Sequence, residues 1–196
     1  MSTQHSINTL HLATEERRPD LASAESAAEA FLRALGVDTD SADMASSPRR
    51  MAAAYSELLS APEFEPTTFK NDRAYSGLVI ARSVPVQSIC EHHFLPFTGT
   101  AHIGYVPGER ILGLSKLARL AEMFARRPQV QERLTQQIAD WLVDNLAPRS
   151  VGVVIDAEHT CMTLRGVRAT GSTTRTSVFT GDLLENPTGF LVQLPS

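Results

Sequence analysis

The sequence predicts an α+β domain with an antiparallel sheet, preceded by an N-terminal helical extension. Two helical patterns come first, and the order strand, strand, helix, helix, strand, strand follows them. Strands in pairs, with two neighbouring helices between the pairs, indicate antiparallel pairing rather than the strand–helix alternation of a Rossmann fold. Neither a Gly-rich phosphate loop nor an internal repeat interrupts this order.

The N-terminal part predicts a tail and two helices. Residues 1–19 mix polar and charged types without periodicity, so we expect a disordered tail. A helix is expected over about 21–35, where apolar residues keep helical spacing and Gly36 follows. A second helix is expected from Ser47-Pro48, since Ser is a good N-cap and Pro suits a first turn. We expect three parts along the chain: the tail 1–19, the helical extension 20–65 and the main domain 66–196.

Two strands are expected on either side of a turn at residues 90–96. Residues 78–89 are rich in β-branched types, and Pro85 within them indicates an edge or a bulge. Residues 97–105 alternate between apolar and polar, which is the period of a strand with one buried face. The preceding residues 61–76 are interpreted as a loop.

Helices and then strands are expected in the second half of the chain. A helix should start at Ser115, as its N-cap, and end near Arg127-Pro128. A longer one over 129–146 carries the strongest amphipathic pattern. A β-branched strand follows at 151–157, and the chain is expected to stay extended over 158–178.

Composition and charge narrow the class of protein. A net charge of -4 over 196 residues argues against a nucleic-acid or membrane-surface binder, which would carry a basic surplus. There is no run of about 18 apolar residues that would predict a membrane span. Residues 1–10 lack the apolar core of a signal peptide. We therefore expect a cytoplasmic protein, in which two cysteines are thiols or metal ligands rather than a disulfide.

Each of the two cysteines lies two residues from a histidine. Cys90 begins the run Cys-Glu-His-His, and His159 precedes Cys161 at the end of a predicted strand, where residues two apart share a face. A lone cysteine is commonly only a small buried hydrophobe, but both having histidine neighbours favours a metal site. Thiolate and imidazole suit zinc, and three ligands with a vacancy are the catalytic arrangement.

The histidines allow two kinds of role. His93 is the better ligand candidate, since three residues separate it from Cys90 at a turn. His92 and His159 would then lie near the metal as proton carriers, because the pKa of histidine is near neutrality. Either could instead hydrogen-bond a carbonyl.

Other charged residues have simpler explanations as well as functional ones. Glu132, beside Gln131, could be a solvated helix-start charge that the helix dipole favours, or could bind the donor edge of a base. Basic side chains could clamp phosphates or remain solvated; these are Lys116, Arg119, Arg165 and Arg168.

Three blocks of the sequence resemble the signatures of the GTP cyclohydrolase I family. They are Ser88–Phe97, then Gly113–Arg119 with Arg127–Thr135, and finally His159-x-Cys161 with Arg165–Val167. The resemblance runs from about residue 24 to 190. It implies the tunnelling fold, in which subunits pool their sheets into a barrel, and toroidal homodecamers with active sites between subunits.

The resemblance also implies the reaction and the residues. The family converts GTP and water to 7,8-dihydroneopterin triphosphate and formate, the first step of folate and pterin biosynthesis. Carried over by position, the zinc ligands would be Cys90, His93 and Cys161. The proton carriers would be His92 and His159, with Ser115 near the ribose. The guanine edge would be held by Glu132 helped by Gln131, and the triphosphate by Lys116, Arg119, Arg165 and, from a neighbouring subunit, Arg50.

One departure from the family pattern keeps alternatives open. Ala53 stands where the family's early helix usually has a lysine, which weakly favours a paralogue that stops at a ring-opened formamidopyrimidine nucleotide. A non-catalytic purine- or pterin-binding homologue is disfavoured by the intact His92 and His159. The nitrile reductase of the same fold uses a cysteine nucleophile without zinc, and the second cysteine here disfavours it.

Overall fold

A computed structural model describes residues 18–195 of the chain. The described residues divide into two compact units, one up to residue 60 and one from residue 61 onward. The tail expected over 1–19 lies almost entirely outside the described residues. No described helix has the length and apolar character needed to cross a membrane.

The first unit holds the two helices expected from the sequence. Helix α1 spans Leu21–Ala34 and helix α2 spans Ser47–Leu58. The Asp20 carboxylate caps α1 by accepting a hydrogen bond from the Ser23 amide at 3.0 Å. The expected N-cap of α2 is wrong by one residue, because Ser46 takes that position and Ser47 is already helical.

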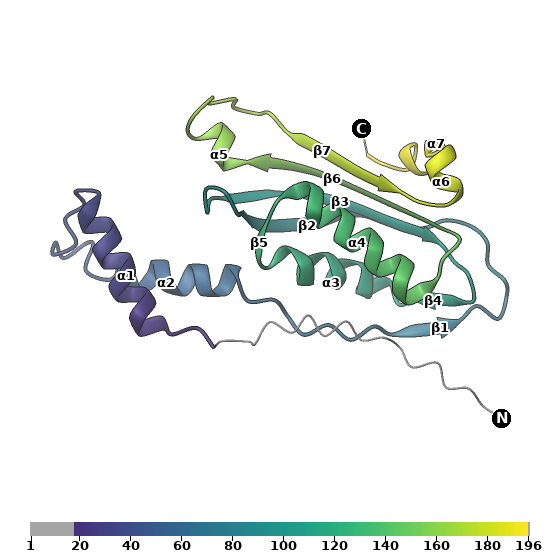
Figure 1. Cartoon of the computed structure of the whole chain (residues 1–196), viewed down its shortest axis with the longest axis horizontal. Coiled ribbons are helices and arrows are strands. Elements are labelled where there is room, and N and C mark those ends of the chain that lie inside the picture. The colour runs from purple at the N-terminus through teal and green to yellow at the C-terminus, as the bar shows by residue number, and fades with distance from the viewer. Residues whose placement is uncertain (1–17, 196) are drawn as a thin grey trace. The chain divides into compact units, whose positions relative to one another are not determined.

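The second unit is organised around a five-stranded sheet with the order β5-β2-β3-β6-β7 (Figure 1). Its strands are β2 (Val79–Cys90), β3 (Pro96–Val106), β5 (Pro128–Gln129), β6 (Ser150–His159) and β7 (Thr174–Phe179). The β2–β3, β3–β6 and β6–β7 pairs are antiparallel, whereas the two-residue β5 runs parallel to β2. This confirms the predicted α+β class with the strand and helix order of the tunnelling fold.

Two helices cover one face of this sheet and bury the main core between them. Helix α3 spans Leu114–Ala125 and α4 spans Gln131–Leu146. Their predicted apolar faces are buried, as shown by Leu117, Leu120, Ala121, Phe124, Leu134, Ile138, Trp141, Leu142 and Leu146. The start of α3 is corrected: Gly113 is the N-cap and Ser115 lies in the first turn.

The opposite face is covered at one end by two four-residue helices that the sequence did not predict. They are α6 (Asp182–Glu185) and α7 (Thr188–Leu191). Phe190 of α7 is fully buried and packs over Gly152, where an added Cβ would lie 2.7 Å from the ring. The glycine therefore allows the close approach of the C-terminal segment to β6.

The expected extended segment over 158–178 is wrong in its first half. Strand β6 continues to His159, and the chain then turns into the short helix α5 (Thr160–Thr163) before β7 begins at Thr174. The loop expected over 61–76 contains a further short strand, β1 (Thr68–Lys70), which pairs with β4 (Arg110–Leu112). Three-residue strands are too short to show a period.

Pro85 lies beside a β-bulge, as its position in β2 indicated. The register between β2 and β3 shifts between Ala81 and Val84, and Ser83 has a φ of 53°. The Ser83 amide donates to Nδ1 of His102 at 3.2 Å. His102 belongs to the polar face of β3, yet it is buried beside the bulge, and its cross-strand partner Val154 belongs to the apolar cluster of the C-terminal helices.

The buried His102 should make stability depend on pH. Burial lowers the pKa of His102 below its usual value near 6.5, with Asp156 opposing that shift and Arg175 and Arg82 adding to it. The folded state therefore favours the neutral ring. The contribution of His102 to the free energy of unfolding is complete above pH 6.5 and is lost as the pH falls through the lowered pKa. We expect the urea concentration at the midpoint of unfolding to decrease as the pH is lowered from 7 to 5.

Replacement of His102 by Asn keeps a side-chain acceptor for the Ser83 amide but removes the titration. The variant should show a shallower fall of the urea midpoint over the same pH range. An equal slope in both proteins would assign the pH dependence to other groups.

Candidate active site at the thiol–imidazole cluster

A cavity of about 300 Å³ opens where β2 and β6 end and α4 begins. Seven residues named from the sequence as site candidates line it: Cys90, His92, His93, Gln131, Glu132, His159 and Cys161. Gln129, Val130, Met162 and Thr174 complete the lining. Segments about 70 positions apart in the chain thus meet at one end of the sheet.

The turn after β2 holds the first part of the site. The Cys90 amide donates to the Leu95 carbonyl at 2.9 Å, and the Phe94 amide donates back to the Cys90 carbonyl at 2.8 Å. Phe94 takes a left-handed conformation, with a φ of 55°. This tight turn buries Cys90 and leaves the His92 side chain 64% exposed.

The sulfur and nitrogen atoms of the cluster lie close enough to share one ion. Both cysteine Sγ atoms and one ring nitrogen of His159 lie within 4.8 Å of one another. The Nδ1 atom of His93 is 4.0 Å from the Cys90 Sγ. Two ligands of a tetrahedral zinc ion are about 3.6 Å apart, from bond lengths of about 2.3 Å to sulfur and 2.0 Å to nitrogen.

The electrostatics of the two thiols also fit a cation. Burial raises the pKa of the Cys161 thiol, and the neighbouring Cys90 raises it further. The Cys161 thiolate is therefore disfavoured unless a positive charge compensates it. A soft donor set of sulfur and imidazole nitrogen is the set that zinc prefers.

His159 is held in a defined orientation. Its ring stacks on Phe97 with a centroid distance of 4.5 Å and an interplanar angle of 12°. Its Nε2 lies 2.8 Å from Oε1 of Gln131. Burial lowers the pKa of His159, while the nearby Glu132 carboxylate opposes that shift.

Glu91 is a site residue to which the sequence assigned no role. Its carboxylate accepts two hydrogen bonds from the Arg133 guanidinium, at 2.6 and 2.9 Å, and these bonds lower the pKa of Glu91. The Glu91 amide also donates to the Gln129 carbonyl at 3.0 Å. The turn that carries Cys90 and His93 is thus tied to the first turn of α4. The sequence did not predict this pair, because Glu91 and Arg133 are 42 positions apart.

The predicted phosphate contacts on α3 and after α5, and Ser115, which was expected near the ribose, are not among the residues that line this cavity. Ser115, Lys116 and Arg119 lie in the first two turns of α3, and Arg165 is exposed in the loop after α5. None of these four is among the described residues that line the cavity. Arg50 is exposed on α2, in the first unit.

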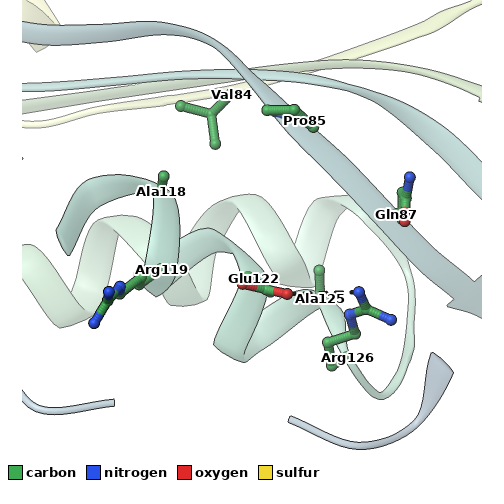
Figure 2. Close-up of a pocket in the computed structure, with 8 residues that line it drawn as sticks. All are labelled: Val84, Pro85, Gln87, Ala118, Arg119, Glu122, Ala125 and Arg126. Atoms are coloured by element: carbon green, nitrogen blue, oxygen red, sulfur yellow. Dashed lines mark hydrogen bonds and ion pairs between the residues drawn. The ribbon is translucent and has the colours of Figure 1, made fainter. Parts of the chain in front are cut away.

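Arg119 lines a different cavity, of about 260 Å³, between β2 and α3 (Figure 2). Glu122 and Arg126 also line it and are joined by an ion pair of 3.5 Å. Two apolar side chains, Val84 of β2 and Ala118 of α3, face one another from opposite sides of it. Within one chain, therefore, Arg119 lies at a different cavity from the thiol–imidazole cluster.

Together, the fold and the site define an enzyme of the tunnelling-fold class with thiols and imidazoles in its cavity. Residues 24–190 match the family model described as GTP cyclohydrolase I. With this match over most of its length, the chain belongs to the GTP cyclohydrolase I family.

Relatives in three bacteria support the same assignment. GTP cyclohydrolase 1 of Mycobacteroides abscessus is 50% identical over 83% of this chain and 82% of its own. The Corynebacterium aurimucosum protein of that name is 48% identical over 87% of this chain and 90% of its own length. The Allorhizobium ampelinum protein of that name is 45% identical over 87% of this chain and 88% of its own length. Among solved structures, the apo form of the archaeosine synthase QueF-Like matches 53% of this chain and 93% of its own, with a TM-score of 0.45 and 14% identity.

Replacement of Glu91 by Ala should weaken metal binding more than it weakens the fold. The ion pair with Arg133 is partly exposed, so its loss should change the free energy of unfolding little. Without this ion pair, however, the turn should misplace the metal ligands that it carries and lower the affinity for Zn²⁺ about tenfold. Competition with a chromophoric chelator measures this affinity.

The matched control is Glu122→Ala, which removes the ion pair with Arg126 on α3. It should leave the Zn²⁺ affinity unchanged. An equal affinity in the Glu91→Ala variant and the unmodified chain would show that the tie does not position the ligands.

Proposed function

We propose that this chain hydrolyses the purine ring of GTP at C8, releases formate and rearranges the product to 7,8-dihydroneopterin triphosphate. The observation that carries the proposal is one cavity that gathers two thiols, three imidazoles and the Glu132 carboxylate, in a chain of the GTP cyclohydrolase I family. The product is a precursor of folates and pterins. We further propose that the enzyme works in the cytoplasm.

Zinc is the metal that this donor set fits. Cys90, His93 and Cys161 would hold it, since the Cys90–His93 separation of 4.0 Å is close to that of two ligands on one ion. Zinc bound there would activate water for attack on C8 of the purine. His159, the other imidazole of the cluster, would then remain available to move a proton.

The chain's own residues supply recognition and proton transfer. Glu132, exposed at the start of α4 and lining the cavity, can accept hydrogen bonds from N1–H and the exocyclic amine of guanine. Adenine offers no such donor pair, so its binding would leave the carboxylate unpaired. His159 would protonate N7 as the imidazole ring opens. His92, exposed at the mouth, and Ser115 would serve the later proton transfers at the ribose.

The site would be completed by neighbouring subunits in a homodecamer. Among the described residues, the outer edge of β2 is paired only at Ile89–Cys90, and β7 pairs only with β6, so both edges of the sheet can continue into other copies. Leu114 and Leu164, beside Ser115 and Arg165, are 72% and 76% exposed. Exposed apolar side chains next to predicted ribose and phosphate contacts support an interface there.

Two variants test the division of roles in the site. Cys161→Ala should lose both zinc and GTP turnover, whereas His159→Ala should keep zinc and lose turnover by about 10²-fold or more. Metal content by elemental analysis, pterin absorbance and formate release measure these effects. Loss of zinc in the His159 variant would make His159 a ligand. Absence of both metal and product in the unmodified chain would contradict the proposed function.

The alternative product is separated by mass. A paralogue that stops after ring opening, as Ala53 weakly favours, would accumulate a formamidopyrimidine nucleotide that still carries the formyl group. Release of formate in equal amount to GTP consumed would contradict it.

Mixing of two inactive variants tests whether the site is shared. Cys161→Ala removes a residue of the cavity, and Arg50→Ala removes a predicted phosphate contact from α2 of another subunit. If the two residues serve one site from different subunits, random mixing should leave about a quarter of the sites complete. Turnover at low GTP should then exceed that of either variant alone. No gain on mixing, in an assembly shown to exchange subunits, would place both residues in one subunit's site.

A further inference from the structure

We infer that Gln131 is a positioning residue that keeps His159 protonated on Nε2, so that Nδ1 is the nitrogen that exchanges a proton with the substrate. The hydrogen-bond network of Gln131 carries this inference. The assignment of Nδ1 to the reaction rests on the proposed function, whereas the protonation of Nε2 does not.

The orientation of the Gln131 amide is fixed by carbonyl groups. Gln131 is 2% exposed, and its Nε2 donates to the carbonyls of Ile155 at 3.0 Å and Thr174 at 2.9 Å. A carbonyl oxygen can only accept a hydrogen bond. A flipped amide would place Oε1 against both carbonyls, so the nitrogen must face them.

Two threonine hydroxyls agree with this orientation. Thr135 donates its only hydroxyl proton to the Gln131 backbone carbonyl at 2.8 Å. Thr176, 2.6 Å from the Thr135 hydroxyl, must therefore donate to it. The Thr176 oxygen is then an acceptor for Gln131 Nε2, which lies 3.1 Å away. The three acceptors around Gln131 Nε2 share its two protons, so one proton serves two of them, and only one amide orientation satisfies the network.

The consequence falls on His159. With the nitrogen of Gln131 committed, its Oε1 faces His159 Nε2 at 2.8 Å as an acceptor. Two acceptors cannot form this bond, so Nε2 carries a proton in both charge states of the ring. The neutral ring therefore has its lone pair on Nδ1. Stacking on Phe97, at 4.5 Å between centroids, keeps the ring from turning over.

The network also changes the role expected of Gln131. Both protons of its amide nitrogen are directed to acceptors within the chain, so it has none to offer a guanine base. It acts through His159 instead. In the proposed reaction the His159 imidazolium gives the proton on Nδ1 to N7 of the purine and returns to the neutral ring with its proton on Nε2.

The first test is spectroscopic and independent of activity. Long-range ¹H–¹⁵N correlations on ¹⁵N-histidine protein, with the His159 signals assigned by their loss in His159→Asn, report which nitrogen carries the proton. We expect the Nε2–H tautomer in metal-free and zinc-loaded protein. In Gln131→Met, which has similar volume and no acceptor for Nε2–H, a mixture of tautomers should appear. An Nδ1–H tautomer in the unmodified chain overturns the inference.

The second test is kinetic. Gln131→Met should lower kcat about 10²-fold and leave KM for GTP within about twofold, because it removes an orientation and not a substrate contact. Gln136→Met is the matched control: it makes the same substitution on the same helix, at an exposed side chain that bonds only Asp140 in the described contacts. It should change neither constant. A raised KM with unchanged kcat would make Gln131 a substrate contact and overturn the inference.

The positioning role of Gln131 and the proposed function can be overturned independently of one another. If the unmodified chain has the Nε2–H tautomer and Gln131→Met loses it, but neither protein turns over GTP, the proposed function fails and the positioning role stands. If GTP is turned over and the tautomer is the same in both proteins, the positioning role fails. If Gln131→Met does not fold, the tautomer measured in the unmodified chain decides the inference by itself.

Discussion

The site depends on the antiparallel register between β3 and β6. Ten residue pairs join the two strands, and Phe97 lies opposite His159 at the end of this ladder. The same strand β3 pairs with β2 so that Pro96 lies opposite Ile89, directly before Cys90. A slip of one residue would turn His159 to the other face of the sheet and away from the thiols. The long buried ladder therefore fixes the chemistry at its end.

The sequence predicted the elements that are long and periodic. Helices α3 and α4 and strands β2, β3 and β6 each bury a face over many residues, so their hydrophobic patterns are strong. The parts that were missed are held by tertiary contacts instead. Helix α7 forms where Phe190 packs over Gly152, and His102 is buried beside a bulge, and neither contact leaves a period in the sequence.

The pairing of His159 with Cys161 was expected for a reason that the structure does not support. The sequence placed both on one strand, where residues two apart share a face. In the structure the strand ends at His159, and Cys161 lies in the first turn of α5. The two side chains still meet, because the Thr160 hydroxyl donates to the Pro96 carbonyl at 2.6 Å and turns the chain back over the end of β3. The residue types were informative even where the local geometry was wrong.

The cavity holds the histidines that would move protons, whereas the predicted phosphate contacts on α3 and after α5 do not line it. Gln131 and Phe97 hold His159, and the backbone bonds of Cys90 fix its turn, so this half of the site is complete within one chain. Arg119 and Arg165 are exposed and Lys116 is half-buried, and none of the three lines the cavity, although the charge of Arg165 acts on the Cys161 thiol. A triphosphate bound to one chain would therefore meet few of them. The proposed binding of the triphosphate would then depend on assembly, whereas the orientation of His159 is already built into the folded chain.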